Sequence, residues 1–118
     1  MNDSRQVKIF DTTLRDGQQC PGAGMSFERC LEYAHLASDL GVDVLEAGFP
    51  SASKLDFEIV KTIAEELSVV EDSPVVAGLC QLRSEQIDTT IESLLPGIAS
   101  HKARLHVYLP VDPYLLKA

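Results

Sequence analysis

Four short runs rich in apolar and β-branched residues recur along the chain, separated by longer amphipathic stretches. The runs cover residues 7–10, 42–45, 74–79 and 104–108. Segments of this length and composition are typical of buried β-strands. In the three stretches between them, apolar residues repeat at three- and four-residue steps, which predicts helices with one buried face. The predicted order is therefore strand, helix, strand, helix, strand, helix, strand.

Residues that start and stop helices delimit the three helical stretches. The first helix is expected to begin after Ser26, a good N-cap, and to end before Gly41, which can take a positive φ. The second should begin near Ser53, and the third should begin near Ser84 and stop at residues 96–97, Pro-Gly. The predicted buried stripes are Phe27, Cys30, Leu31, Ala34, Ala37 and Leu40 in the first helix, Phe57, Val60, Ile63, Ala64 and Leu67 in the second, and Ile87, Ile91, Leu94 and Leu95 in the third.

This alternation of strands and helices indicates an α/β fold with a parallel sheet and right-handed crossovers. A doubly wound sheet and a piece of a barrel would both satisfy the pattern. A closed eight-stranded barrel needs about 200 residues or more. The 118 residues here supply about three and a half βα units. If the fold is a barrel, we expect the chain to be incomplete as a catalytic unit, with open sheet edges that drive it to form homo-oligomers or aggregates.

The amino-acid composition limits the classes of molecule that the protein is expected to bind. Ten Lys and Arg residues against 18 Asp and Glu residues give a net charge of −8, which disfavours nucleic acid and anionic membrane surfaces. No apolar run approaches the roughly 18 to 20 residues that span a bilayer, and residues 1–5 lead into a strand without a signal-peptide pattern. The three cysteines, Cys20, Cys30 and Cys80, lack CxxC spacing, which favours reduced thiols. We therefore expect a cytoplasmic protein.

Side chains that could bind a ligand or take part in catalysis lie at the carboxyl ends of the predicted strands, where α/β proteins bind ligands. Arg15 and Asp16 follow the first strand, where a guanidinium can stabilise an oxyanion and a carboxylate can hold a cation. Glu46 ends the second strand, and Arg15 is its obvious partner. The competing interpretation of Arg15 and Asp16 is a solvated turn, and that of Glu46 is an ion pair with a purely structural role. His106, within the fourth strand, is either a core residue or a ligand of the site.

The segment Phe10–Gln19, FDTTLRDGQQ, resembles the signature of the DRE-TIM metallolyase superfamily. Residues 41–53, 56–58 and 103–106 are similar to the corresponding segments of the 2-isopropylmalate synthases in particular. The resemblance implies a partial (β/α)₈ TIM barrel. It identifies residues 1–118 as the incomplete N-terminal part of a pyruvate-carboxyltransferase-like (HMGL-like) domain. It also implies an acyltransferase that condenses acetyl-CoA with a 2-oxo acid, 2-oxoisovalerate, in leucine biosynthesis.

The same resemblance implies roles for individual residues. Asp16 is expected to ligate a divalent metal, Mg²⁺, Mn²⁺ or Zn²⁺. Arg15 is expected to stabilise the oxyanion and to contact the substrate, and Glu46 to position that arginine. Gln19 and His106 are expected to bind the 2-oxo acid, and acetyl-CoA is expected as co-substrate.

Two departures from the synthase pattern keep alternatives open. The chain has no His-x-His motif, which supplies the other metal ligands in the family, so we expect the isolated chain to be inactive. After His106 it reads Val-Tyr-Leu-Pro-Val-Asp, where the synthases usually have Thr-Phe-Ile-Ala-Thr-Ser. That segment lines the 2-oxo-acid pocket in the family. Homocitrate and citramalate synthases therefore remain alternatives, as does a non-catalytic part-barrel module that acts through assembly.

Overall fold

Strands and helices alternate along the chain in the predicted order. A computed structural model describes residues 6–17 and 24–111. The elements are β1 (Phe10–Asp11), α1 (Phe27–Leu40), β2 (Val44–Gly48), α2 (Lys54–Ser68), β3 (Val75–Gln81), α3 (Ser84–Ile98) and β4 (Ala103–Tyr108).

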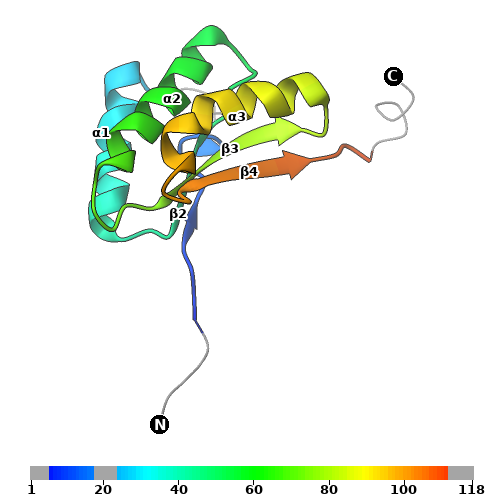
Figure 1. Ribbon diagram of the computed structural model, residues 1–118. Helices are drawn as coiled ribbons and strands as arrows, with labels where there is room; N and C mark the ends of the chain where they lie inside the picture. The colour runs from blue at the N-terminus through cyan, green and yellow to red at the C-terminus, as the bar shows by residue number, and fades with distance from the viewer. Residues whose placement is uncertain (1–5, 18–23, 112–118) are drawn as a thin grey trace.

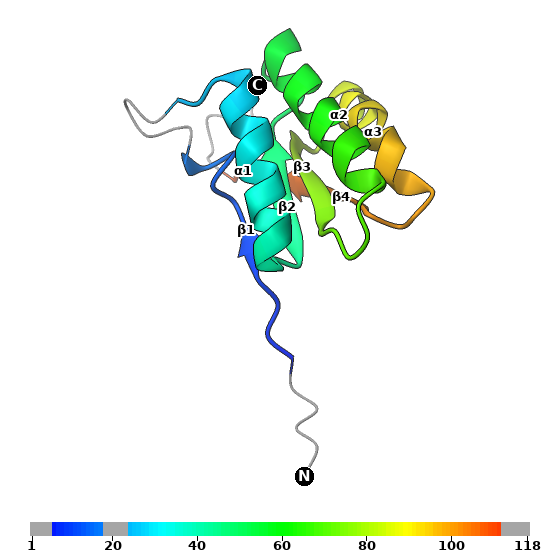
Figure 2. The same cartoon turned by 90° about the vertical axis from the view of Figure 1, so that its left-hand side faces the viewer.

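The four strands form one parallel sheet in the order β1-β2-β3-β4, so each strand pairs with its neighbour in the sequence. Figures 1 and 2 show α1, α2 and α3 together on one side of the sheet. A doubly wound sheet would carry helices on both faces, whereas sequential strand order with helices on one side is the arrangement of a barrel segment. The prediction of a partial (β/α)₈ barrel is confirmed.

Local capping chemistry explains where the first two helices begin and where α1 ends. The Ser26 hydroxyl accepts a hydrogen bond from the backbone N–H of Arg29 at 3.3 Å, and that of Ser53 accepts one from Asp56 at 3.0 Å. Gly41 takes φ 84°, a left-handed conformation that costs a residue without Cβ little. These predicted boundaries are confirmed because each depends on a few neighbouring residues.

The end of α3 was predicted wrongly, since the helix continues through Pro96 to Ile98. A proline in the last turn removes one intrahelical hydrogen bond. Packing beyond the helix offsets that loss: the Gly97 carbonyl accepts a bond from the Lys102 backbone N–H at 2.8 Å. A Cβ at Gly97 would meet the Lys102 carbonyl oxygen at 3.1 Å, so the helix end lies close against the chain that enters β4.

The first three strands end further along the chain than predicted, whereas the fourth starts one residue earlier, at Ala103. The first strand was predicted at residues 7–10, but β1 pairs with β2 only at Phe10 and Asp11. The backbone N–H of Ile9 instead donates to the Asp43 carboxylate at 2.7 Å, which takes the place of a ladder bond. The second strand begins at Val44 rather than residue 42 and extends to Gly48.

The hydrophobic core lies between the helices and the face of the sheet that they cover. The predicted stripes of α1 and α2 point into it with two exceptions. Leu40, in the last turn of α1, is exposed, and Phe57 of α2 lines a hollow outside the core. None of the described helices is long and apolar enough to cross a membrane. The core includes Cys30, Ala34, Ala37, Leu45, Ala47, Val60, Ile63, Leu67, Val76 and Leu94.

The buried face of α3 differs from the predicted stripe. Leu94 is buried as expected, but Ile91 and Leu95 are exposed, and Thr90 and Ser93 are buried in their place. A Cβ at Gly78 of β3 would stand 2.8 Å from the Thr90 methyl group, so α3 approaches β3 too closely for larger side chains. Carbonyls of α3 itself accept hydrogen bonds from both buried hydroxyls, which removes the cost of burying them.

Candidate functional site

Three predicted side chains meet at the carboxyl end of the sheet. Glu46 of β2 is fully buried. One of its carboxylate oxygens accepts a hydrogen bond from Nε of Arg15, and the other contacts Nδ1 of His106. The two partners come from the β1–α1 turn and from β4. The structure therefore brings together Arg15, Glu46 and His106.

Barrel geometry explains how His106 reaches Glu46 across the intervening strand. Side chains of alternate strands share a layer in the interior of a (β/α)₈ barrel, and β2 and β4 are alternate strands. Ala77 of β3 lies in register with Glu46, and Leu79 lies in register with His106. Because the residue beside Glu46 is small, the imidazole can lean over β3 to the carboxylate.

The Glu46 carboxylate acts as a clamp for two nitrogen donors. A buried carboxylate is costly unless its oxygens are paired, and both oxygens here are. Since a carboxylate only accepts hydrogen bonds, Nδ1 of His106 must carry the proton in this contact. The Nε2 nitrogen is then the ring atom left for a ligand. Arg15 remains partly accessible, with 19% of its side chain exposed, so Glu46 orients the guanidinium without enclosing it.

The β1–α1 turn directs Arg15 and Asp16 to different surroundings. The backbone N–H groups of both residues donate to the Thr12 carbonyl, at 3.1 and 2.7 Å, and Leu14 is buried in the core. This anchoring turns Arg15 inward to Glu46. The Asp16 side chain stays 66% exposed, with Oδ1 3.3 Å from Nη1 of Arg15.

A cluster that sequence reasoning missed supports the same turn from α1. The Tyr33 hydroxyl donates to Asp11 Oδ2 at 2.6 Å, and the Thr13 backbone N–H donates to Asp11 Oδ1 at 2.8 Å. Burial by itself would raise the pKa of Asp11, but these hydrogen bonds outweigh it and hold that pKa below its ordinary value. Burial, together with the neighbouring carboxylate, raises the pKa of Tyr33. The sequence feature that could have pointed to Tyr33 is an aromatic residue beside the buried stripe of α1.

A cavity of about 370 Å³ opens at this end of the sheet. Arg15 and His106 line it together with Phe49, Leu79 and Tyr108, and the last three were not predicted as site residues. Their position in the sequence could have identified them, since each lies at or near the end of a strand. The Phe49 and Tyr108 rings meet edge to face, with centroids 6.4 Å apart. The Arg15 guanidinium beside an apolar lining suits a small anion that carries an apolar group.

A divalent cation finds one candidate ligand here. The exposed Asp16 carboxylate is a hard oxygen donor of the kind that Mg²⁺ and Mn²⁺ prefer. Within residues 6–17 and 24–111, no group of three or more His, Cys, Asp or Glu side chains is placed to hold a metal. Asp16 thus fits one position in a metal site, and the other ligands must come from elsewhere. The predicted substrate contact Gln19 lies outside the described residues.

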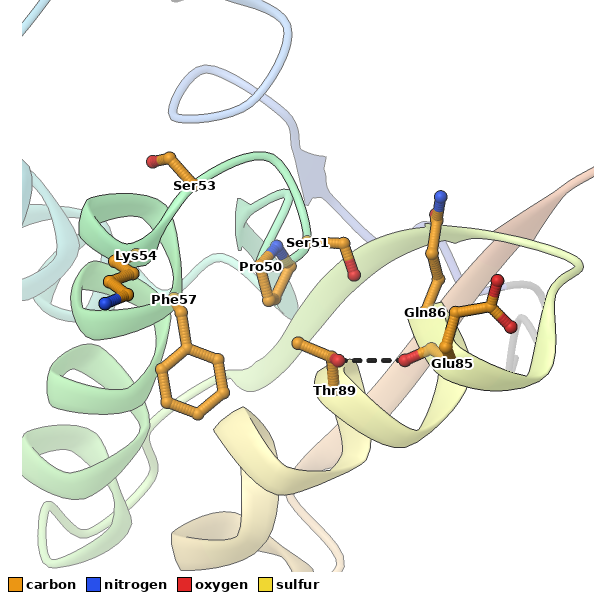
Figure 3. A pocket seen from close by; sticks show the side chains of 8 residues that line it. All are labelled: Pro50, Ser51, Ser53, Lys54, Phe57, Glu85, Gln86 and Thr89. Atoms are coloured by element: carbon orange, nitrogen blue, oxygen red, sulfur yellow. Dashed lines mark hydrogen bonds between the residues drawn. The ribbon is translucent and has the colours of Figure 1, made fainter.

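A second hollow, of about 490 Å³, lies between the β2–α2 loop and the start of α3 (Figure 3). The Phe57 ring and the Thr89 side chain face it, whereas the charged ends of Lys54 and Glu85 point away from that ring. The Ser51 hydroxyl oxygen is buried without a hydrogen-bond partner. With no charged group directed into it by the residues that line it, this hollow is a weaker candidate for catalysis than the cavity at Arg15.

Comparison with known proteins agrees with the geometry. Residues 6–118 match the HMGL-like family. The chain is 43% identical over 116 residues to the 2-isopropylmalate synthase of Bradyrhizobium sp. (strain ORS 278), covering 98% of this chain and 21% of that protein. It is 46% identical over 112 residues to that of Rhodopseudomonas palustris (strain BisA53), with 95% and 20% covered.

A plant relative extends the comparison. Over 121 residues the chain is 41% identical to the chloroplastic 2-isopropylmalate synthase 2 of Arabidopsis thaliana, covering 99% of this chain and 19% of that protein. The chain therefore spans about a fifth of the length of these curated relatives. The match over residues 6–118, with a parallel sheet and helices on one side, shows that the chain belongs to the HMGL-like family.

Proposed function

We propose that this chain forms the first part of the catalytic barrel of a 2-isopropylmalate synthase. In this reaction acetyl-CoA, 2-oxoisovalerate and water give 2-isopropylmalate and CoA. The observation that carries the proposal is the Glu46 clamp, which holds Arg15 and His106 beside one cavity at the carboxyl end of the sheet. Relatives at 41–46% identity that are named 2-isopropylmalate synthase support the choice of reaction.

The lining of the cavity matches the parts of a branched 2-oxo acid. Arg15 offers N–H donors to the carboxylate and the keto oxygen, whereas His106, whose N–H faces Glu46, lines the same cavity as a hydrogen-bond acceptor. Phe49, Leu79 and Tyr108 offer apolar surface to the isopropyl group. A second carboxylate, as in 2-oxoglutarate, would lose hydration against Phe49 and Leu79, and the Tyr108 hydroxyl is the one donor that these three side chains offer it. This lining therefore favours 2-oxoisovalerate over the substrate of a homocitrate synthase.

The residues of this chain contribute to one step of the chemistry in particular. A base that another part of the barrel would supply removes a proton from the methyl group of acetyl-CoA. The methyl carbon then forms a bond with the keto carbon, and negative charge develops on the keto oxygen. Arg15, held in a fixed orientation by Glu46, stabilises that charge. Water then cleaves the thioester and CoA leaves. A divalent cation with Asp16 among its ligands would polarise the keto group when bound.

Further parts of the proposal concern the whole protein. We infer that residues 1–118 are the N-terminal part of the barrel domain and that other strands supply the remaining metal ligands. A complete barrel would also cover the inner face of the sheet, which no described helix packs against. We further propose that the enzyme acts in the cytoplasm as a homo-oligomer, on small molecules rather than on nucleic acid or membrane.

The test is a substrate panel with the complete enzyme that carries this chain. Acetyl-CoA is combined with 2-oxoisovalerate, pyruvate, 2-oxobutyrate or 2-oxoglutarate in the presence of Mg²⁺ or Mn²⁺. Free CoA thiol is followed over time, and products are identified by mass spectrometry. The expected result is the highest kcat/KM with 2-oxoisovalerate. A preference for pyruvate or 2-oxoglutarate would reassign the substrate, and no CoA release with any of the four acids would reject the proposal.

A further inference from the structure

We propose that Tyr33 is a positioning residue of this site, and that its hydroxyl fixes the β1–α1 turn from which Arg15 and Asp16 project. The catalytic consequence of this inference rests on the proposed function, whereas its geometric content does not. Tyr33 belongs to α1 and acts on the site through Asp11, at the end of β1.

The hydrogen bonds around the Tyr33 hydroxyl have only one consistent arrangement. The hydroxyl carries one proton, and Asp11 Oδ2, a carboxylate oxygen 2.6 Å away, can only accept it. The Thr13 hydroxyl, 3.1 Å from the phenol oxygen, must then be the donor in the second contact. The Thr13 backbone N–H donates to the other Asp11 oxygen. The phenol therefore ties the end of β1 to the first residues of the turn.

The part of α1 that carries Tyr33 is packed firmly into the core. Ala34 follows it directly, and Cys30 and Ala37 stand one turn before and one turn after it. All three are buried in the core. A short polar contact made from such a support restrains the turn more than a contact between two exposed side chains would.

The restraint reaches Arg15 along the backbone. Beyond Thr13, the buried Leu14 side chain and the two N–H bonds to the Thr12 carbonyl leave little freedom before Arg15. The guanidinium then meets Glu46. Without the Tyr33 hydroxyl, the first half of the turn loses its attachment to α1, and Arg15 samples orientations outside the Glu46 clamp.

The test compares Tyr33→Phe, which removes only the hydroxyl, with a control on the same helix. His35→Ala deletes a contact of similar length, 2.7 Å to Glu66 of α2, which does not involve the turn. Two readouts are measured on the complete enzyme that carries this chain. The first is the NMR signal and water exchange of the Arg15 Nε–H group, and the second is the pair kcat and KM for 2-oxoisovalerate.

Tyr33→Phe should shift the Arg15 signal and speed its exchange, and His35→Ala should change neither. Misplacement of this kind should lower kcat roughly 10-fold while KM stays within about twofold. Asp11→Asn, which weakens the same contact from the other side, should reproduce both effects if Tyr33→Phe folds poorly. An unchanged Arg15 signal in Tyr33→Phe and Asp11→Asn, or an equal change in His35→Ala, would overturn the proposal. If the wild-type enzyme releases no CoA, the proposed function fails, and the Arg15 signal still decides the role of Tyr33.

Discussion

Replacing Glu46 by glutamine tests the clamp with the smallest change in shape. The carboxylate accepts one hydrogen bond on each oxygen, from Arg15 and from His106. A glutamine side chain offers one acceptor oxygen and one NH₂ donor. The oxygen should turn to the charged guanidinium of Arg15. The NH₂ group then faces Nδ1 of His106, which must give up its proton and accept instead, so the imidazole changes tautomer.

The magnitude follows from the contacts that change. A hydrogen bond to a charged group contributes about 1.5–3 kcal/mol. Glu46→Gln loses the charged acceptor toward His106 and weakens the one toward Arg15. Because 41% of the His106 side chain is exposed, the lower end of the range applies to that contact. A combined loss of about 2–3 kcal/mol in the transition state corresponds to a decrease in kcat/KM of roughly 30- to 150-fold.

The assay pairs steady-state kinetics of the complete enzyme with nitrogen NMR of His106. Glu46→Gln should show the lower kcat/KM and a proton on Nε2 rather than Nδ1. Asp43→Asn is the matched control, since Asp43 stands just before the amino end of β2 and bonds the Ile9 backbone N–H. It should leave kcat/KM within about twofold, because the loss is a single backbone contact away from the site. Glu46 does not orient these side chains if Glu46→Gln keeps kcat/KM within the same limit and leaves the His106 tautomer unchanged.

Three further predictions concern the metal, the turn and the packing. Asp16→Ala should weaken Mn²⁺ binding by calorimetry by roughly tenfold or more, since it removes a ligand, and equal weakening in Arg15→Ala would contradict the division of roles. Tyr33→Phe should cost about 1 kcal/mol in urea unfolding at neutral pH. Because the pKa of Asp11 is lowered in the folded protein, the stability that this contact contributes is fully present above pH 3.8 and is lost as the pH falls through the lowered pKa. A stability difference between the wild type and Tyr33→Phe that persists in strong acid would exclude the contact. Gly78→Ala should destabilise the fold by about 1–3 kcal/mol, because its Cβ would stand 2.8 Å from a threonine methyl group of α3, and an unchanged melting temperature would contradict this packing.

The order of elements could be predicted from the sequence because it depends on local chemistry. Caps such as Ser26 and Ser53 bond to backbone groups three residues away, and the sequence shows these neighbours directly. The buried face of α3 could not be predicted in the same way. Its small residues face the core because Gly78 lets the helix approach β3 closely, and that distance is a tertiary property.

In the candidate site, too, some contacts could be predicted from the sequence and others could not. The pairing of Arg15 with Glu46 was predicted, since adjacent strand ends meet and a strand carboxylate needs a partner. The contact of His106 with that same carboxylate was not predicted, because it crosses β3 and requires the strand register. The support from Tyr33 was also missed, since it joins α1 to the end of β1 through a contact between residues 22 positions apart.

The central claim is that Arg15, oriented by Glu46, stabilises the charge that develops when acetyl-CoA condenses with the 2-oxo acid. The most direct measurement is the rate of CoA thiol release by the complete enzyme and by its Arg15→Ala variant, at saturating 2-oxoisovalerate, acetyl-CoA and Mn²⁺. We expect release by the wild type and a kcat lower by on the order of 10²- to 10³-fold in the variant, with Mn²⁺ affinity retained. Wild-type release that Arg15→Ala leaves unchanged would contradict it.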